Sequence, residues 1–226
     1  MLRQYFVNLG WRRVLYMALG NIFIGMGVSI FKLAQLGNDA FNGMVMSLSD
    51  LIGINYGTFF VVVSVLLFVI QVLFGREFIG IGTLFNMFLQ GYIATFFYSV
   101  WTGLSFSPES LVIRIIVMCV GVVICALGLS MYQSANAGVA SYDSLPMIMA
   151  KRFTKVPYFF WRILADGICA LICFTSGGLV GIGTLVGTFG FGPIIQFFNV
   201  NLMNRLLKEK ASDNKKNKVS DIQPAQ

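Results

Sequence analysis

The sequence has few charged residues and no histidine. Of its 226 residues, 11% are charged and 57% are hydrophobic, and the mean hydropathy is +0.80. A soluble domain of this length needs many more charged residues to cover its surface. The composition therefore excludes an ordinary soluble protein and predicts an integral membrane protein.

Residues suited to metal, redox or nucleotide chemistry are also scarce. The four cysteines, Cys119, Cys125, Cys169 and Cys173, lie inside long apolar runs, and no histidine is present to complete a metal site around them. Packing as small apolar residues explains them better. The sequence contains no phosphate-binding loop, dinucleotide fingerprint or nucleophile elbow. We therefore expect no metal, no cofactor and no enzymatic activity, although membrane enzymes can be poor in motifs.

Six apolar runs approach the roughly 20 residues that a helix needs to cross a bilayer. They cover residues 14–31, 56–74, 80–100, 111–132, 157–175 and 181–200. The first run is too long for a cleaved signal peptide, and it begins too far behind its basic residues. We expect an all-α membrane protein with six transmembrane helices, in one integral membrane domain over residues 1–204.

Basic residues lie mainly on one predicted side of the membrane. They are Arg3, Arg12, Arg13, Arg76, Lys151, Arg152, Lys155 and six residues between Arg205 and Lys218. Lys32 and Arg114 are the exceptions. The positive-inside rule then places both termini in the cytoplasm. Residues 205–226 mix charges and lack aromatic residues, which predicts a disordered cytoplasmic tail, with weak attraction to anionic lipid, rather than a nucleic-acid-binding segment.

The pentapeptide GIGTL occurs twice, beginning at Gly80 and at Gly181, 101 residues apart. The same offset relates other identical residues without a gap, among them Gly20 and Gly121, Gly27 and Gly128, Ser29 and Ser130, Gly37 and Gly138, and Met46 and Met147. This pattern predicts a duplication, with repeat 1 at about 12–100 and repeat 2 at about 111–201. Three spans in each copy require inverted orientations, as in many secondary transporters, which bind solutes near the midplane. The alternative is a duplication that only builds a stable bundle.

A polar segment follows the first span of each repeat, at residues 36–55 and 136–155. Each begins with a Gly-containing turn and continues with apolar residues at helical spacing, and each is too short to cross the membrane alone. We expect a short interfacial helix or half-helix in both. Asp39 and Asp143 stand at positions suited to N-caps, and contact with a substrate is the alternative role for both.

Several segments resemble the YczE/YyaS/YitT family of bacterial integral membrane proteins, and its YczE-like branch most. They are GIGTLFNMFLQGYIATFF, GGLVGIGTLVGTFGFGPIIQFF, and YDSLPMIMAKRF with an Arg and an acid in the next helix. The resemblance extends from the first span to Phe198. The first half departs from the pattern because LGNDAFNG lacks the expected Pro, and Asp166 stands where Glu is usual. The resemblance implies a multi-pass protein of the bacterial inner (plasma) membrane, in a family without a settled substrate.

Polar residues inside the spans are the main candidates for a binding site, because burying them in lipid is costly. Arg162 and Asp166 lie four residues apart on the fifth predicted helix, and Asp166 lies near the midplane. The two Gly-x-Gly-Thr helix starts could present backbone amides to an anionic group, or pack closely against other helices. The candidate substrate-binding residues are therefore Asp166, Arg162, Thr83, Thr184, Gly82, Gly183, Asn86, Asp39 and Asp143.

We expect the protein to bind or transport a small polar or amphipathic solute at the interface of the two repeats. Its size and topology also resemble the substrate-capture subunits of energy-coupling-factor importers, which dock on a separate membrane partner. A non-transporting scaffold or accessory protein is the third alternative. The expected partners are the lipid bilayer and a small-molecule solute, with a homo-oligomer or a membrane partner subunit as further candidates, and no nucleic acid.

Overall fold

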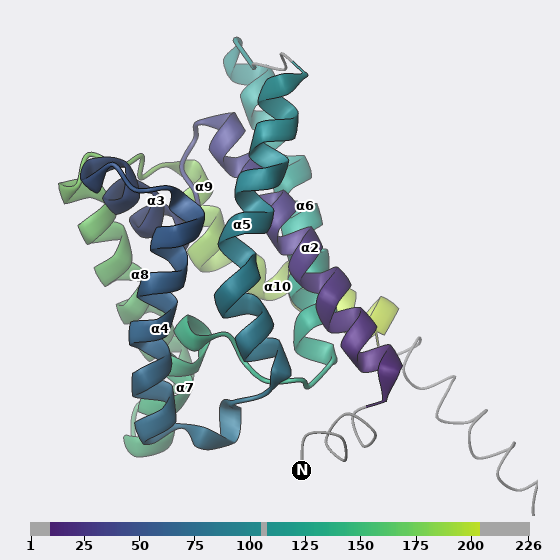
Figure 1. Cartoon of the computed structure of the whole chain (residues 1–226), viewed down its shortest axis with the longest axis vertical. Helices are drawn as coiled ribbons and strands as arrows, with labels where there is room; N and C mark the ends of the chain where they lie inside the picture. Colours follow the sequence, from purple (N-terminus) through teal and green to yellow (C-terminus); the bar gives the residue numbers. More distant parts are fainter. Residues whose placement is uncertain (1–9, 105–107, 204–226) are drawn as a thin grey trace, which may run out of the picture.

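The computed structural model describes residues 10–104 and 108–203, which form helices and no strands (Figure 1). The all-α fold expected from the sequence is thus confirmed for this part of the chain. The predicted tail, residues 205–226, lies outside the described residues.

The two halves of the chain contain similar series of helices. The N-terminal half has α2 (Trp11–Ala34), α3 (Ala40–Ile52), α4 (Tyr56–Phe74), the 3₁₀ helix η1 (Arg76–Phe78) and α5 (Ile81–Gly103). The C-terminal half has α6 (Leu111–Ser134), α7 (Ser141–Arg152), α8 (Tyr158–Thr175), α9 (Ile182–Leu185), the π-helix η2 (Val186–Gly190), α10 (Phe191–Phe198) and the π-helix η3 (Asn199–Met203). The first five predicted runs correspond to α2, α4, α5, α6 and α8, and both ends of each run lie within three residues of the ends of its helix. The sixth is broken, with a bend of 49° between residues 182–190 and 193–202.

The two short helices begin differently, because a side chain caps α3 and none caps α7. The carboxylate of Asp39 accepts a hydrogen bond of 3.1 Å from the backbone amide of Asn42, so the predicted N-cap of α3 is confirmed. The corresponding prediction for Asp143 is wrong. Helix α7 starts at Ser141 after Ala140, and Asp143 lies within the first turn, where its carboxylate pairs with Arg162 instead.

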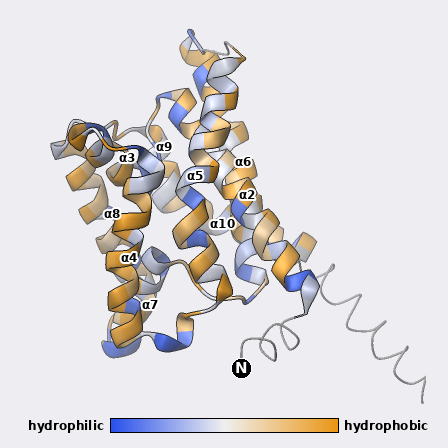
Figure 2. Ribbon diagram, viewed as in Figure 1, coloured by the Kyte–Doolittle hydropathy of each residue, from blue (hydrophilic) through white to orange (hydrophobic). Residues whose placement is uncertain are grey.

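Four helices of the described residues are long and apolar enough to cross a membrane: α2, α4, α6 and α8. The bent pair after α8 makes a fifth if it counts as one span. Figure 2 shows that hydrophobic residues predominate along these helices. Many of their large apolar side chains are exposed, such as Leu66, Ile116 and Leu171, at 63%, 57% and 64%. So much exposed apolar surface is unfavourable in water and favourable in lipid. The protein is a multi-pass membrane protein.

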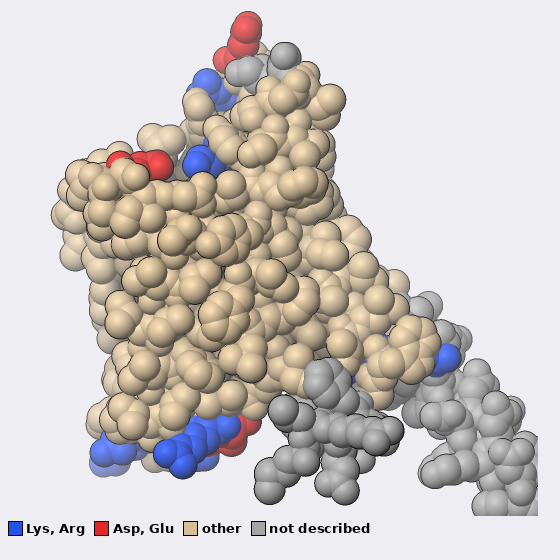
Figure 3. Space-filling view, viewed as in Figure 1, with Lys and Arg blue, Asp and Glu red and all other residues tan. Residues whose placement is uncertain are grey.

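Basic side chains gather at one end of the molecule, at the bottom of Figure 3. Arg76, Lys151, Arg152 and Lys155 are exposed there, where α4 and α7 end and α8 begins. Lys151 also donates a hydrogen bond of 2.6 Å to the Glu77 carboxylate, and this contact lowers the pKa of Glu77. We refer to this end as the basic end.

The two halves interlock through long and short helices. Helix α2 packs along α6, and the backbones approach closely where small residues meet: a Cβ added to Gly20 would lie 2.8 Å from the Gly128 carbonyl oxygen. Helix α3 packs on α8 of the other half, while α7 packs on α4. Each short helix therefore lies against the second long helix of the opposite half.

The repeated pentapeptides lie at two equivalent contacts between the halves. The backbone amide of Gly82 donates to the carbonyl of Ala137 at 2.7 Å, and that of Gly183 donates to the carbonyl of Leu36 at 2.9 Å. The two pairs are related by the sequence offset, since 82 + 101 = 183 and 36 + 101 = 137. Each GIGTL segment thus docks on the turn that follows the first helix of the other half.

Candidate functional site

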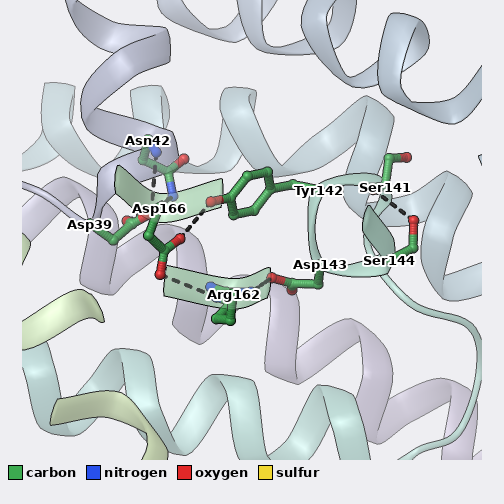
Figure 4. A network of polar contacts seen from close by, with 8 residues as sticks. All are labelled: Asp39, Asn42, Ser141, Tyr142, Asp143, Ser144, Arg162 and Asp166. Atoms are coloured by element: carbon green, nitrogen blue, oxygen red, sulfur yellow. Dashed lines mark hydrogen bonds and ion pairs between the residues drawn. The ribbon is translucent and has the colours of Figure 1, made fainter. Parts of the chain in front are cut away.

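A small cavity lies among the helices where α3 and α7 approach each other. Its volume is about 80 Å³, and both halves contribute to its wall. Polar residues of the two short helices and α8 line it: Asp39, Asn42, Ser141, Tyr142, Asp143 and Arg162 (Figure 4). A buried water needs roughly 10–15 Å³ of such space. The central cavity therefore has room for several waters or one small solute.

Arg162 of α8 connects two carboxylates from different helices. Its Nη1 donates to Oδ1 of Asp143 at 2.5 Å, and its Nε donates to Oδ2 of Asp166 at 3.2 Å. The hydroxyl of Tyr142 donates to Oδ1 of Asp166, also at 2.5 Å. Asp166 is only 3% exposed, and these two contacts compensate for the cost of its burial. The network fixes α7 against α8.

A second network faces the cavity from the N-terminal half. The Nδ2 of Asn42 donates to the Asp39 carboxylate at 2.8 Å, and Oδ1 of Asn42 accepts from the Tyr56 hydroxyl at 2.5 Å. These contacts are local to α3 and the start of α4. They hold the Asp39 carboxylate in place without neutralising its charge.

Two stacked rings join α3 to α7 beside these networks. Phe41 and Tyr142 have ring centroids 4.3 Å apart and planes inclined by 12°. They occupy equivalent positions of the two halves, since 41 + 101 = 142. Phe60 and Phe191 also line the central cavity. One part of the wall is therefore aromatic and the other carries charge.

Two hydroxyls of the wall are buried and unsatisfied. Tyr132 and Ser141 are 3% and 4% exposed, and their hydroxyl oxygens have no hydrogen-bond partner within the described part of the chain. Buried polar groups are rarely left without a partner, so each such group requires an explanation. A solute or water in the cavity would supply one.

The central cavity adjoins a larger depression of about 600 Å³, which we call the vestibule. The vestibule shares Tyr132, Asp143 and Arg162 with the cavity and extends to Glu77 at the basic end. The Arg162–Asp143 ion pair thus stands between the two spaces. A depression at the opposite end, lined by Lys32 and Asp50, shares no lining residue with the central cavity. The cavity therefore borders the vestibule on the side of the basic end.

The structure brings together five of the nine candidate residues and places four elsewhere. Asp39, Asn86, Asp143 and Arg162 line the cavity, and Asp166 binds two of its lining residues. The other four lie in the contacts between the halves: Gly82, Gly183, Thr83 and Thr184.

Both threonine hydroxyls already have partners in the chain itself. Thr83 donates to the carbonyl of Val139 at 2.8 Å, and Thr184 donates to that of Asn38 at 2.7 Å. The amides of the adjacent glycines are used in the same way. These residues therefore join the two halves in this structure. This agrees with the alternative that the Gly-x-Gly-Thr segments pack closely against other helices.

Sequence reasoning did not single out Tyr142, Asn42, Tyr132 or Ser141 as site residues. Aromatic residues make up 15% of the chain, so no single tyrosine stands out. The one available signal was the position of Tyr142 beside Asp143 in the segment SYDS, which follows the turn of the second repeat.

The described residues contain no group of three or more His, Cys, Asp or Glu side chains that could hold a metal ion. Cys125, Cys169 and Cys173 are buried free thiols, in agreement with a packing role. The chemistry available in the cavity is thus ion pairing, hydrogen bonding and aromatic contact.

Comparison with known proteins assigns the chain to a family. Residues 11–200 match a family of unknown function, DUF6198. The chain is 30% identical over 184 residues to the uncharacterized membrane protein YczE of Bacillus subtilis, covering 79% of this chain and 81% of that protein. It is 24% identical over 193 residues to the uncharacterized protein YyaS of the same organism, covering 82% and 92%. No solved structure matches. Since the match covers most of its length, the chain belongs to the DUF6198 family and, as its resemblance to YczE and YyaS indicates, to the YczE/YyaS group of membrane proteins.

Proposed function

We propose that this membrane protein binds a small solute in the central cavity and carries it across the bilayer. One observation carries the proposal: a cavity between the two halves has an ion-pair network in its wall and two buried hydroxyls that have no hydrogen-bond partner among the described residues. Charges and unsatisfied polar groups at membrane depth are costly, and they are typical of solute pathways.

We infer that the chain crosses the membrane six times, as two inverted repeats. In this arrangement α5 is the third span, and the bent segment from α9 to η3 is the sixth. The support comes from contacts that recur at the offset of 101, such as Gly82 with Ala137 and Gly183 with Leu36. When residue i contacts j and their two counterparts also contact each other, the halves are related by an approximate two-fold axis. Transporters built from inverted repeats bind solutes at such an axis.

The basic end gives the orientation of this arrangement. We infer that it faces the cytoplasm of a bacterial cell and that both termini lie on that side, in agreement with the positive-inside rule. The vestibule then opens to the cytoplasm, and the central cavity is accessible from inside the cell. Release or capture on the other side requires a second conformation, as expected for alternating access.

A cavity-filling substitution tests the proposal. Ser64 of α4 lines the cavity and is 4% exposed, so Ser64→Leu adds two heavy atoms to a side chain in the cavity wall. Ser99→Leu is the matched control, because Ser99 is exposed on α5 away from the cavity. The purified full chain is screened by thermal shift against amines, amino acids, nucleobases, vitamins and organic anions. We expect one class to raise the melting temperature of the wild type and of Ser99→Leu but not of Ser64→Leu.

Transport is then measured in vesicles that contain the purified protein and the ligand found in the screen. Uptake that is lost in Ser64→Leu and kept in Ser99→Leu supports carriage of the solute. A folded, monodisperse protein that no class stabilises would overturn the proposal and favour an accessory role. Binding without uptake, together with co-purification of a membrane partner and ATPases, would favour a capture subunit.

A further inference from the structure

We infer that the solute is a small organic cation and that Asp39 is its counterion. This inference deepens the proposed function and rests on it, because it concerns the occupant of the same cavity. It follows from four features of the site: its charge, the position of Asp39, its aromatic wall and its unsatisfied hydroxyls.

The charges around the cavity do not balance. Asp39, Asp143 and Arg162 line it, and Asp166 accepts hydrogen bonds from two lining residues, Tyr142 and Arg162. Three carboxylates and one guanidinium leave a net charge of −2 if all are ionised. The residues that line the cavity include no second basic side chain. A cation entering this space is therefore attracted, and an anion is repelled.

Of the three carboxylates at the cavity, Asp39 is the one that has no charged partner among the described residues. Arg162 pairs with Asp143 and Asp166, whereas the contacts of Asp39 within the described residues are to Asn42 and to backbone. A buried carboxylate is stable when a positive group lies close to it. Because Arg162 is already engaged by two carboxylates, a cationic ligand is the group that this site lacks.

The aromatic wall and the free hydroxyls suit an organic cation in particular. Phe41, Phe60 and Phe191 line the cavity, and an ammonium group is attracted to the face of an aromatic ring. The hydroxyl oxygens of Tyr132 and Ser141 are buried and can accept hydrogen bonds from ammonium protons. Hard metal cations instead require several oxygen ligands in one shell. The volume of about 80 Å³ limits the ligand to a few heavy atoms around the charge.

Three probes of similar shape and different charge test the inference. They are tert-butylammonium, tert-butanol and pivalate, added to the purified full chain while its melting temperature is measured. We expect tert-butylammonium to stabilise the protein by several degrees, tert-butanol to have little effect and pivalate to have none. The ranking follows from charge, since the tert-butyl group is common to all three.

Asp39→Asn and Asp50→Asn make the test specific to the site. Asparagine is as good an N-cap as aspartate, so Asp39→Asn removes the charge and retains the cap of α3. Asp50 lies near the end of the same helix, is exposed and does not line the central cavity. We expect Asp39→Asn to weaken binding of tert-butylammonium at least about tenfold, which is about 1.4 kcal/mol, and Asp50→Asn to leave it unchanged.

The outcomes separate this inference from the proposed function. If pivalate or tert-butanol binds best, and Ser64→Leu abolishes that binding, the cavity is a solute site but the cation is wrong. If tert-butylammonium binds equally well to wild type and Asp39→Asn, Asp39 is not its counterion and the inference fails. If none of the three probes binds, the inference fails, and the broader screen decides the proposed function separately.

Discussion

At the scale of single residues, Gly183 allows the backbones of the two halves to touch. A Cβ added to Gly183 would lie 2.1 Å from the carbonyl oxygen of Gly37, a distance that neither backbone can accept without moving. The amide of Gly183 also donates to Leu36. The close approach and the hydrogen bond therefore depend on the absence of a side chain at this position.

We predict that Gly183→Ala destabilises the folded protein by about 3 kcal/mol, the upper range for overpacking at a tight site. Gly167→Ala is the control: Gly167 is exposed on α8, and no atom lies within 4 Å of the added Cβ. Alanine also favours a helix over glycine by about 1 kcal/mol, so this variant should not be destabilised. Equilibrium unfolding in mixed micelles measures both. Equal stability of Gly183→Ala and wild type would contradict the docking contact seen here.

At the scale of helices, the ion pairs of Arg162 hold α7 against α8. Asp143 comes from the first turn of α7, and Arg162 and Asp166 lie one turn apart on α8. Removing only the guanidinium leaves two carboxylates near the centre of the protein without a positive partner. The energetic cost therefore depends on which carboxylates remain.

We predict that Arg162→Gln destabilises the protein by about 3–5 kcal/mol, the usual cost of breaking a buried ion pair; partial exposure of Arg162 to the vestibule favours the lower end. The double variant Arg162→Gln/Asp143→Asn should lose less stability than the sum of the single variants, because it removes one of the unpaired charges. Thermal unfolding of the four proteins measures this coupling. Lys151→Gln is a control with little expected effect, since that ion pair is exposed to water. Additive losses would show that Arg162 and Asp143 act independently.

The helices were largely predictable from the sequence, but the cavity was not. Long apolar runs predicted the positions of α2, α4, α6 and α8, because a helix that crosses lipid must be continuously apolar. The bend in the sixth predicted run was missed. Gly187, Gly190 and Gly192 do not interrupt the hydrophobic run in the sequence, but in the structure a π-helical turn over Val186–Gly190 interrupts the regular helix.

The candidate site was only partly predictable for a different reason. Arg162 and Asp166 stood out because charge is rare inside an apolar run. Tyr142 and Asn42 did not, because their importance comes from meeting other helices: Tyr142 reaches Asp166, and Asn42 reaches Tyr56. Such contacts between segments depend on the tertiary packing and leave no periodic pattern in the sequence.

At the scale of the whole molecule, the central cavity borders the depression at the basic end of the described residues. The vestibule reaches Glu77 and the basic end, whereas the depression beside Lys32 has no lining residue in common with the cavity. The equivalent residues Met46 and Met147, 101 positions apart, line these two opposite depressions. Inverted repeats make a definite prediction for such a pair: the two side chains face opposite sides of the membrane.

We predict that Met147→Cys reacts with a membrane-impermeant thiol reagent from the cytoplasmic side, and that Met46→Cys reacts from the other side. Each variant is made with the four native cysteines replaced by alanine, which breaks no disulfide because all four are free thiols. Labelling is compared in right-side-out and inside-out vesicles. Met147 lines the larger vestibule and is partly exposed, so its cysteine should also react faster than that of Met46, which is 9% exposed. Labelling of both cysteines from the same side would contradict the inverted arrangement, because side chains at equivalent positions of inverted repeats cannot share one face of the membrane.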